Sequence, residues 1–211
     1  MGLTVNVNVR AQTAYSLDLN KGDSFIWEVK ELDLHNFKKV FDFEPIFEVG
    51  DKIKKEIKDV YELGPGWSVT IEEWDYKSDL NGNGSVTNTY VNKNPSLYIE
   101  DTKIFIPRPV NEYLSEAKET CLGSEYEVKG RTLIKHDKGA GGKRYDMIKV
   151  YDQTGVLLSE TYIDDDDIVL VKVEGLFKVP LGHYFIGFMT VTIIFLIYVM
   201  IRKKKFQVKV T

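Results

Sequence analysis

The long apolar run near the C-terminus constrains the fold of this chain more than any other feature. Residues 179–201 contain no Asp, Glu, Lys or Arg, and His183 is their only ionisable group. As a helix this run would be roughly 34 Å long, enough to cross a hydrocarbon core of about 30 Å. A helix of a soluble domain usually keeps a polar face, whereas apolar side chains cover every face here, with Tyr184 and Tyr198 near the two ends. We predict a transmembrane helix over 179–201; a helix buried in a large domain is the alternative.

The charges that flank the run predict its direction. Four cations, Arg202 to Lys205, follow it at once, whereas the stretch before it is acidic. Lys and Arg close to a span stay in the cytoplasm, so we expect residues 202–211 to form a basic cytoplasmic tail and residues 1–178 to lie outside the cell, next to the lipid bilayer. Residues 1–14 lack the apolar segment of a signal peptide, and we interpret them as the remnant of a signal region. A tail-anchored protein with its large domain in the cytosol is the alternative.

Charge and cysteine content argue against two classes of protein. The chain carries a net charge of −4 and its tail holds five cations, so residues 1–201 carry −9. A domain this acidic would repel phosphates, and we expect no nucleic acid among its partners. Cys121 is the only cysteine, which excludes an intramolecular disulfide and so a disulfide-stapled module. We expect its thiol to be buried and inert.

Period-two alternation dominates residues 22–175 and predicts strands with one buried and one solvated face. The pattern is clearest in "DSFIWEV", where Phe25, Trp27 and Val29 share a face. It recurs in "DKIKKEIKDVYEL", "WSVTIEEWDY", "SVTNTYV" and "SLYIEDTKIFIP". Gly-rich turns such as "LGPGW", "LNGNGS" and "YDQTG" separate the runs. Sheets of this kind are mostly antiparallel.

One helix is predicted among these strands, in "RPVNEYLSEAKETCLG". Pro109 suits the first turn, Tyr113 and Ala117 recur at helical spacing, and the final glycine suits the stop. The order of strands, one helix and further strands predicts a mainly β or α+β domain over residues 15–178. We expect a curved antiparallel sheet with one packed helix, followed by the C-terminal transmembrane helix.

The stretch "DLNGNGSV" resembles a calcium-binding loop. Asp79, Asn81 and Asn83 occupy its first, third and fifth ligand positions, and Gly84 would supply the sharp turn. However, Tyr90 stands where the bidentate Glu belongs, and both flanks alternate as strands do. A plain hairpin turn explains the same Asn and Gly residues. Calcium is the one cofactor that the sequence suggests.

Three further features have both a structural and a functional interpretation. The loop "GAGGKR" departs from a phosphate-binding loop, because Asp137 stands where the first Gly belongs. Asp164 to Asp167 predict a solvated turn between strands, or a weak divalent-cation site. The 3 tryptophans, 12 tyrosines and 11 phenylalanines either fill a core or line a pocket for an apolar ligand.

In "KGDSFIWEV", "VGDKIKKEI" and "VYDQTGVLLSETYI", followed by a C-terminal span and a basic stop, the chain resembles a group of archaeal membrane-anchored cell-surface proteins without assigned function. The "YDQTGVLL" hairpin is also similar to one in the lipoprotein-carrier family. That second resemblance implies a curved antiparallel sheet closed over helices, with an acyl chain as ligand. The matching residues lie within 21–57 and 145–205, and neither resemblance implies site residues.

The sequence suggests no pair of nucleophile and base, so we expect no enzyme and name no catalytic residue. The leading hypothesis is a single-pass cell-surface protein whose β-rich outer domain binds an envelope protein or an apolar ligand. The alternatives are a membrane-tethered lipid-binding or lipid-transfer domain and a membrane-tethered hydrolase. A deep apolar cavity beneath the helix would favour lipid binding, and converging His, Ser or carboxylate groups would favour the hydrolase.

Overall fold

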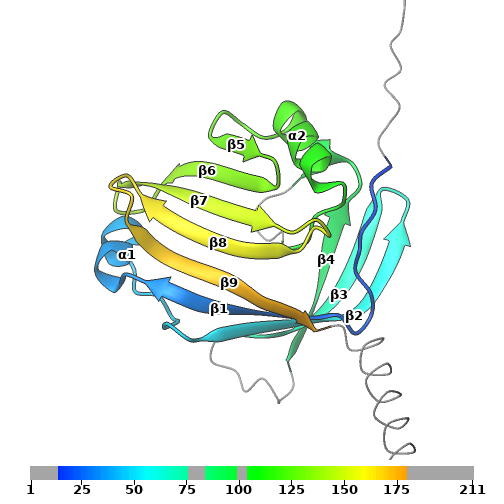
Figure 1. The fold of residues 1–211 in the computed structure, drawn as a ribbon, viewed down its shortest axis with the longest axis horizontal. Coiled ribbons are helices and arrows are strands. Elements are labelled where there is room, and N and C mark those ends of the chain that lie inside the picture. The colour runs from blue at the N-terminus through cyan, green and yellow to red at the C-terminus, as the bar shows by residue number, and fades with distance from the viewer. Residues whose placement is uncertain (1–13, 76–83, 99–103, 180–211) are drawn as a thin grey trace, which may run out of the picture.

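A nine-stranded antiparallel sheet forms the body of the protein (Figure 1). The computed structural model describes residues 14–75, 84–98 and 104–179. The elements in chain order are β1 (Ser24–Leu32), α1 (Leu34–Phe41), β2 (Lys52–Leu63), β3 (Gly66–Trp74), β4 (Ser85–Asn92), the 3₁₀ helix η1 (Pro95–Leu97), α2 (Val110–Thr120), β5 (Tyr126–Lys129), β6 (Thr132–Lys138), β7 (Arg144–Tyr151), β8 (Leu157–Asp164) and β9 (Val169–Val179). The predicted mainly β fold with an antiparallel sheet is confirmed.

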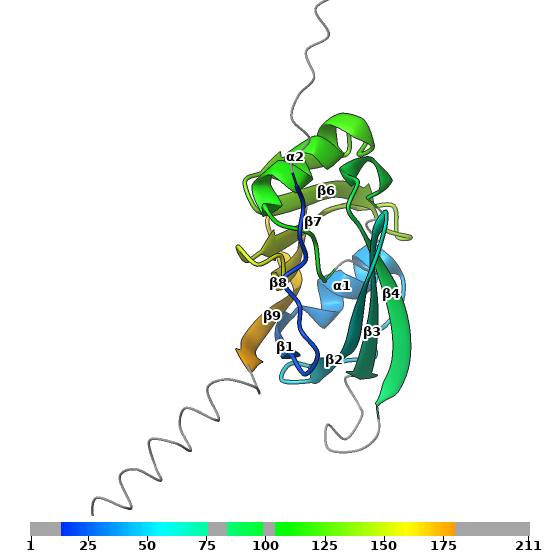
Figure 2. The same cartoon turned by 90° about the vertical axis from the view of Figure 1, so that its right-hand side faces the viewer.

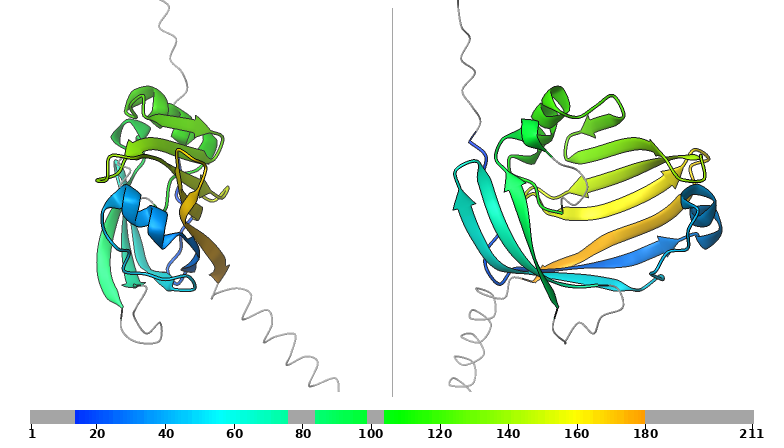
Figure 3. Two further views of the ribbon diagram at one scale, coloured as in Figure 1. Left: turned by 90° about the vertical axis from the view of Figure 1, so that its left-hand side faces the viewer. Right: turned by 180° about the vertical axis from the view of Figure 1, so that it is seen from behind.

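Two meanders meet at the centre of this sheet. The strand order is β4-β3-β2-β1-β9-β8-β7-β6-β5, so that the first and last strands are neighbours. Ser24 pairs with Val179 and Leu32 with Val171. The sheet is strongly curved, and its β2–β4 side faces its β7–β9 side across a concave face (Figure 2). Helix α1 lies across one end of that concavity, and α2 lies beside β5 and η1 (Figure 3).

The alternation in the sequence corresponds to the two faces of the sheet. Phe25, Trp27 and Val29, which the pattern places on one face, are all buried, and so are Trp67, Val69 and Ile71 of β3. Ion pairs cover the convex face instead; Lys58, for example, lies 2.9 Å from Glu56 and 2.5 Å from Glu72. Such exposed pairs contribute about 0–1 kcal/mol each, so the concave face supplies most of the stabilisation through apolar burial.

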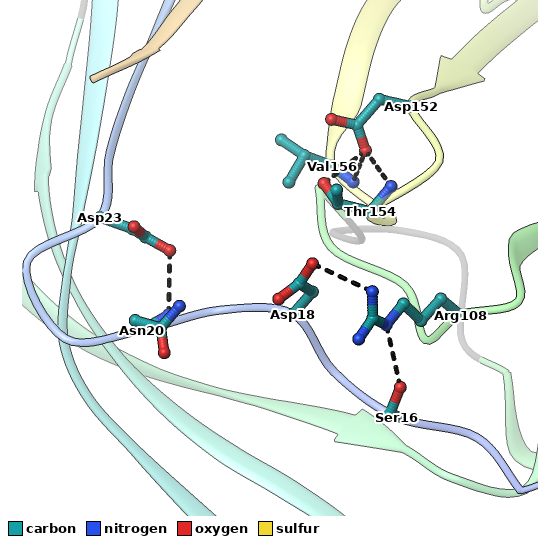
Figure 4. Close-up of polar contacts among 8 residues, drawn as sticks. All are labelled: Ser16, Asp18, Asn20, Asp23, Arg108, Asp152, Thr154 and Val156. Atoms are coloured by element: carbon teal, nitrogen blue, oxygen red, sulfur yellow. Dashed lines mark hydrogen bonds and ion pairs between the residues drawn. The ribbon is translucent and has the colours of Figure 1, made fainter. Parts of the chain in front are cut away.

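The segment before β1 is tied to the loop before α2 (Figure 4). Ser16 and Arg108 exchange backbone hydrogen bonds of 3.0 and 2.8 Å. The Arg108 guanidinium also donates to the Ser16 hydroxyl at 3.1 Å and to Asp18 Oδ2 at 3.3 Å. Further along, the Asn20 N–H donates to Asp23 Oδ2 at 2.9 Å and turns the chain into β1. These contacts hold the segment across one end of the sheet.

The β7–β8 turn holds the other side of the loop before α2. Asp152 Oδ1 accepts from the backbone N–H groups of Thr154 at 2.8 Å and Val156 at 2.9 Å (Figure 4). Beyond it, the Ile106 N–H donates to the Gly155 carbonyl at 2.8 Å. Gly155 has a φ of +88°, and a Cβ there would lie 1.9 Å from the Ile106 carbonyl oxygen. Only glycine fits this turn without displacing the loop.

The described residues contain two α-helices rather than the one predicted. The prediction is confirmed for α2, whose Tyr113 and Ala117 are buried. It missed α1, an eight-residue helix capped by Asp33 with Phe37 and Val40 on its buried side. Helix α1 is only eight residues long, so the helical repeat of its apolar residues is hard to distinguish from the pattern of the strands around it.

Two further expectations are wrong. The stretch "SLYIEDTKIFIP" is not the predicted strand: its described residues enter η1 and make only an isolated bridge from Phe105 to Val156. Pro95 starts the 3₁₀ turn there. Cys121 is exposed rather than buried. It follows the last turn of α2, where its backbone N–H caps the Ala117 carbonyl.

Within residues 14–75, 84–98 and 104–179, no helix combines the length and the apolar character needed to cross a bilayer. The predicted span, residues 179–201, lies outside the described part of the chain except for Val179, which ends β9. The basic tail, residues 202–211, also lies outside it.

Candidate ligand-binding cavity

A cavity of about 580 Å³ lies between the concave face of the sheet and α1 with the loop that follows it. Thirteen of its seventeen lining residues are aliphatic or aromatic, and the other four are Lys55, Lys135, Lys149 and Glu160. Small-molecule sites usually have volumes of about 300–1,000 Å³, apolar walls and a few polar groups. The cavity has each of these properties.

Aromatic side chains form the wall of the cavity on the side of α1. The ring centroid of Phe41 lies 4.5 Å from that of Phe37 on the same helix. It lies 5.0 Å from that of Tyr145 on β7 and 5.8 Å from that of Tyr162 on β8. Ring pairs of this kind contribute about 0.5–1.5 kcal/mol beyond their buried area, so Phe41 joins α1 to the sheet. Phe43, in the same wall, is 57% exposed.

Hydrogen bonds hold α1 at both ends, one local in sequence and one from a distant turn. Asp33 Oδ1 accepts from the Asn36 N–H at 3.1 Å, and this hydrogen bond lowers the pKa of the Asp33 carboxyl. At the other end, the Val40 carbonyl accepts from the Gly141 N–H at 3.0 Å. A Cβ on Gly141 would lie 2.1 Å from the Lys39 carbonyl oxygen. The glycines of "GAGGKR" therefore allow the β6–β7 turn to approach the end of α1.

Trp27 forms part of the floor of the cavity. Its indole N–H donates to the Leu157 carbonyl at 2.8 Å, so the side chain reaches across β9 to β8. Gly175 pairs with Trp27 and leaves room for the indole, because a Cβ there would lie 3.4 Å from Nε1. Trp67 and Trp74 are buried but do not line the cavity. Some aromatic residues therefore line the cavity, and others fill the core.

Three of the four charged residues in the lining interact with a neighbouring side chain. The pairs are Lys55 with Glu73, Lys135 with Asp137 at 3.2 Å, and Glu160 with the Tyr162 hydroxyl at 2.6 Å. Each partner is a residue on the same strand or on a neighbouring one. These charges are therefore satisfied within the sheet.

Lys149 on β7 is the exception. The residue is only 5% exposed, and it lies on the same face of β7 as the buried Met147 and Tyr151. Among the residues that the structure describes, no side chain or carbonyl forms a hydrogen bond or ion pair with its ammonium group. Buried ammonium groups usually have a counter-charge, so Lys149 is the least satisfied polar group of the cavity.

The predicted calcium ligands, Asp79, Asn81 and Asn83, lie outside the described residues. The strands on either side form the expected hairpin, in which β3 pairs with β4 from Gly66 to Glu73. In the described ranges there is no group of three or more His, Cys, Asp or Glu side chains arranged to hold a metal ion. The calcium loop stays a prediction.

The adjacent aspartates form the turn between β8 and β9, as one of the two interpretations expected. Asp164 is buried, and its Oδ1 accepts from the N–H groups of Asp166 at 3.1 Å and Ile168 at 2.9 Å. Asp167 takes the left-handed conformation, with a φ of 61°, which Asp tolerates better than most residues. The Asp164 carboxylate is therefore occupied in closing the turn.

A second hollow bears on the hydrolase alternative. It lies at the ends of β6, β7 and β8, where His136 Nδ1 is 2.7 Å from Asp146 Oδ1. The pair has the form of a base held by a carboxylate. Both side chains are about half exposed, and the described residues that line the hollow include no Ser, Thr or Cys. The geometry there provides an oriented base without a neighbouring nucleophile from those residue types.

Comparisons with protein-family models, with curated proteins and with solved structures found no match for this chain. The resemblances to archaeal cell-surface proteins and to lipoprotein carriers stay predictions.

Sequence reasoning missed most of the residues that make the cavity. The aromatic wall depends on α1, which the alternation concealed, although Asp33 followed by Phe37 and Phe41 carries a cap and a helical repeat. Lys149 was not singled out, because a lysine within a strand is ordinarily assigned to the solvated face. Trp27 was recognised as inward-facing, but only the structure shows that it borders a cavity.

Proposed function

We propose that residues 15–178 bind an apolar ligand in the concave cavity and that residues 179–201 tether this domain to a membrane. The observation that carries the proposal is a cavity of about 580 Å³ with a mainly apolar lining. Side chains of a natural core normally fill such a space to high density. An apolar space of this size is suited to binding a hydrocarbon chain.

The tether rests on the sequence alone. The apolar run and the cations after it support a single-pass protein with the large domain outside the cell. Val171 and Val173 line the cavity, and β9 leads from them to Val179, where the apolar run begins. At about 3.3 Å per residue, these six residues span roughly 20 Å. In this proposal the ligand site is therefore close to the bilayer, and the protein acts by binding rather than by catalysis.

A neutral hydrocarbon probe tests the proposal. The full chain is placed in phosphatidylcholine nanodiscs and exposed to a hexadecanol analogue that carries a photoactivatable diazirine, and labelled peptides are located by mass spectrometry. We expect labels on the peptides that contain Phe41, Met147 and Val173. Val173→Phe fills the cavity and should reduce this labelling severalfold. Val150→Phe, which adds the same side chain to the convex side of β7, serves as the matched control.

Labelling that is unchanged in Val173→Phe, or that avoids the cavity peptides altogether, would refute ligand binding at this site. The lipid-transfer alternative is favoured by one observation: the loop after α1 presents Phe43, Ile46 and Val49 to solvent, at 57%, 75% and 60% exposure. An apolar rim of this kind is suited to contact with a lipid surface. Transfer requires the labelled probe to move from donor to acceptor vesicles faster when the protein is present.

A further inference from the structure

Not all of the charges around the cavity are joined in ion pairs. Its charged lining consists of three lysines and one glutamate. The carboxylates of Glu73 and Asp137 pair with Lys55 and Lys135. After these pairs are formed, the lining retains the positive charge of Lys149 and the negative charge of Glu160, and these two charges are not joined.

Glu160 and Lys149 are opposite each other in the β7–β8 register, so an ion pair between them would be expected. Instead, the Glu160 carboxylate accepts from the Tyr162 hydroxyl at 2.6 Å on its own strand. On the other side of β7, Lys149 faces the fully buried Leu133. The two cross-strand neighbours of Lys149 are therefore an apolar side chain and a carboxylate that is hydrogen-bonded to a tyrosine.

In the empty protein, the Lys149 ammonium group forms no ion pair with a described residue and lines a mainly apolar cavity, so its surroundings stabilise it little. The same group strengthens the binding of any ligand that brings an anion to it, because a charge-assisted hydrogen bond in a partly desolvated site is strong. The hydrocarbon lining selects a chain, and Lys149, the one cation of the described lining that forms no ion pair, selects an acidic head.

We infer that the cavity takes an amphipathic anion, one hydrocarbon chain with an acidic head group, and that Lys149 binds this head group. The inference rests on the proposed function and adds the ligand class to it. A carboxylate and a phosphate monoester share the required chemistry. Lys55 and Lys135 are held by their own acids, so Lys149 is the residue that distinguishes an acidic ligand from a neutral one.

Three probes with the same chain separate the inference from the proposed function. They are the hexadecanol analogue already described and the corresponding palmitate and hexadecyl phosphate analogues, all applied to the full chain in phosphatidylcholine nanodiscs. For the wild-type protein, we expect half-maximal labelling by an acidic probe at a concentration roughly tenfold below that of the alcohol. Competition between unlabelled palmitate and hexadecyl phosphate then identifies the preferred head group.

Variants of Lys149 test its role. Lys149→Met should abolish the preference by weakening the acidic probes roughly tenfold while leaving the alcohol unchanged. Lys149→Arg should retain the preference. The matched control is Lys172→Met, which removes the same charge from the convex face, where Lys172 pairs with Glu174 at 2.7 Å. Without ligand, Lys149→Met should unfold at the same or a higher urea concentration than wild type, because the cation that it removes forms no hydrogen bond or ion pair with a described residue.

Each result has a definite meaning. Equal labelling by acidic and neutral probes in the wild type, or a preference that survives Lys149→Met, overturns the role of Lys149 and leaves apolar binding in place. A lower unfolding midpoint with equal loss of all probes in Lys149→Met makes Lys149 structural and also overturns it. Failure of every probe to label the wild-type cavity instead refutes the proposed function itself.

Discussion

The contact between the β7–β8 turn and the loop before α2 can be tested with one substitution. Gly155 combines a φ of +88° with a close approach to Ile106, whose carbonyl oxygen would lie 1.9 Å from an added Cβ. Gly155→Ala therefore has two destabilising effects. The alanine resists the left-handed conformation, and its methyl group must displace the Ile106 backbone.

The magnitude follows from these two effects. Holding a residue with a side chain at this φ costs about 1–3 kcal/mol. Displacing Ile106 breaks its N–H hydrogen bond to the Gly155 carbonyl, 2.8 Å long in the native protein, and a buried amide left without an acceptor costs about 1–3 kcal/mol. From the sum of these costs, we expect Gly155→Ala to lower the free energy of unfolding by about 2–6 kcal/mol, which is a large part of the stability of a typical domain.

Gly142→Ala is the matched control. Gly142 has a similar φ of +77°, yet an added Cβ would meet nothing within 4 Å. This variant carries the conformational cost alone, about 1–2 kcal/mol. The assay is pulse proteolysis of the full chain in urea, with the intact band quantified on a gel. Equal losses in the two variants would show that the loop does not approach Gly155, and the reasoning would be refuted.

Two other predictions concern the helix and the anchor. Asp33→Ala should lower stability by about 1 kcal/mol through loss of the α1 cap, while Asp33→Asn retains the acceptor and most of that stability, both measured by the same proteolysis. Folding lowers the pKa of the Asp33 carboxyl. The contribution of the cap to stability is therefore complete above the ordinary pKa of 3.8 and is lost as the pH falls through the lowered pKa of the folded protein. A stability difference between wild type and Asp33→Ala that does not change with acid contradicts this. For the anchor, protease added to intact cells should digest the domain of residues 15–178 and spare a tag at the C-terminus, whereas protection of the domain would support the tail-anchored alternative.

Much of the sheet could be predicted because its two faces differ so strongly in polarity. Phe25, Trp27 and Val29 alternate with residues that carry the ion pairs of the convex face, and the pattern fixes which side is buried. The turns at "LGPGW" and "YDQTG" follow from glycine and proline chemistry. The pairing of β1 with β9 could not be predicted in this way, because these strands are the most distant in sequence and no local signal specifies that they pair.

The cavity could not be predicted from the same patterns. A buried aromatic residue looks the same in the sequence whether its neighbours fill the space beside it or leave it open. The aromatic wall also depends on where α1 is held, and that position comes from the Val40 carbonyl bonding to Gly141, about a hundred residues further along the chain. The glycines of that loop were noted only as a poor match to a phosphate-binding loop.

The sequence pattern also does not predict that Lys149 is buried. In "MIKVY", Ile148 and Val150 alternate with Met147, Lys149 and Tyr151, so both faces of β7 contain apolar side chains and the lysine favours assigning its own face to solvent. The structure has the opposite arrangement, because Met147 and Tyr151 enter the interior and the strand period takes Lys149 with them. Residues that break a local rule in a consistent fold tend to mark functional positions. A buried lysine that no described residue pairs with has a physical reason to persist there if a bound anion completes its surroundings. The comparison of Lys149→Met with Lys172→Met measures that effect directly.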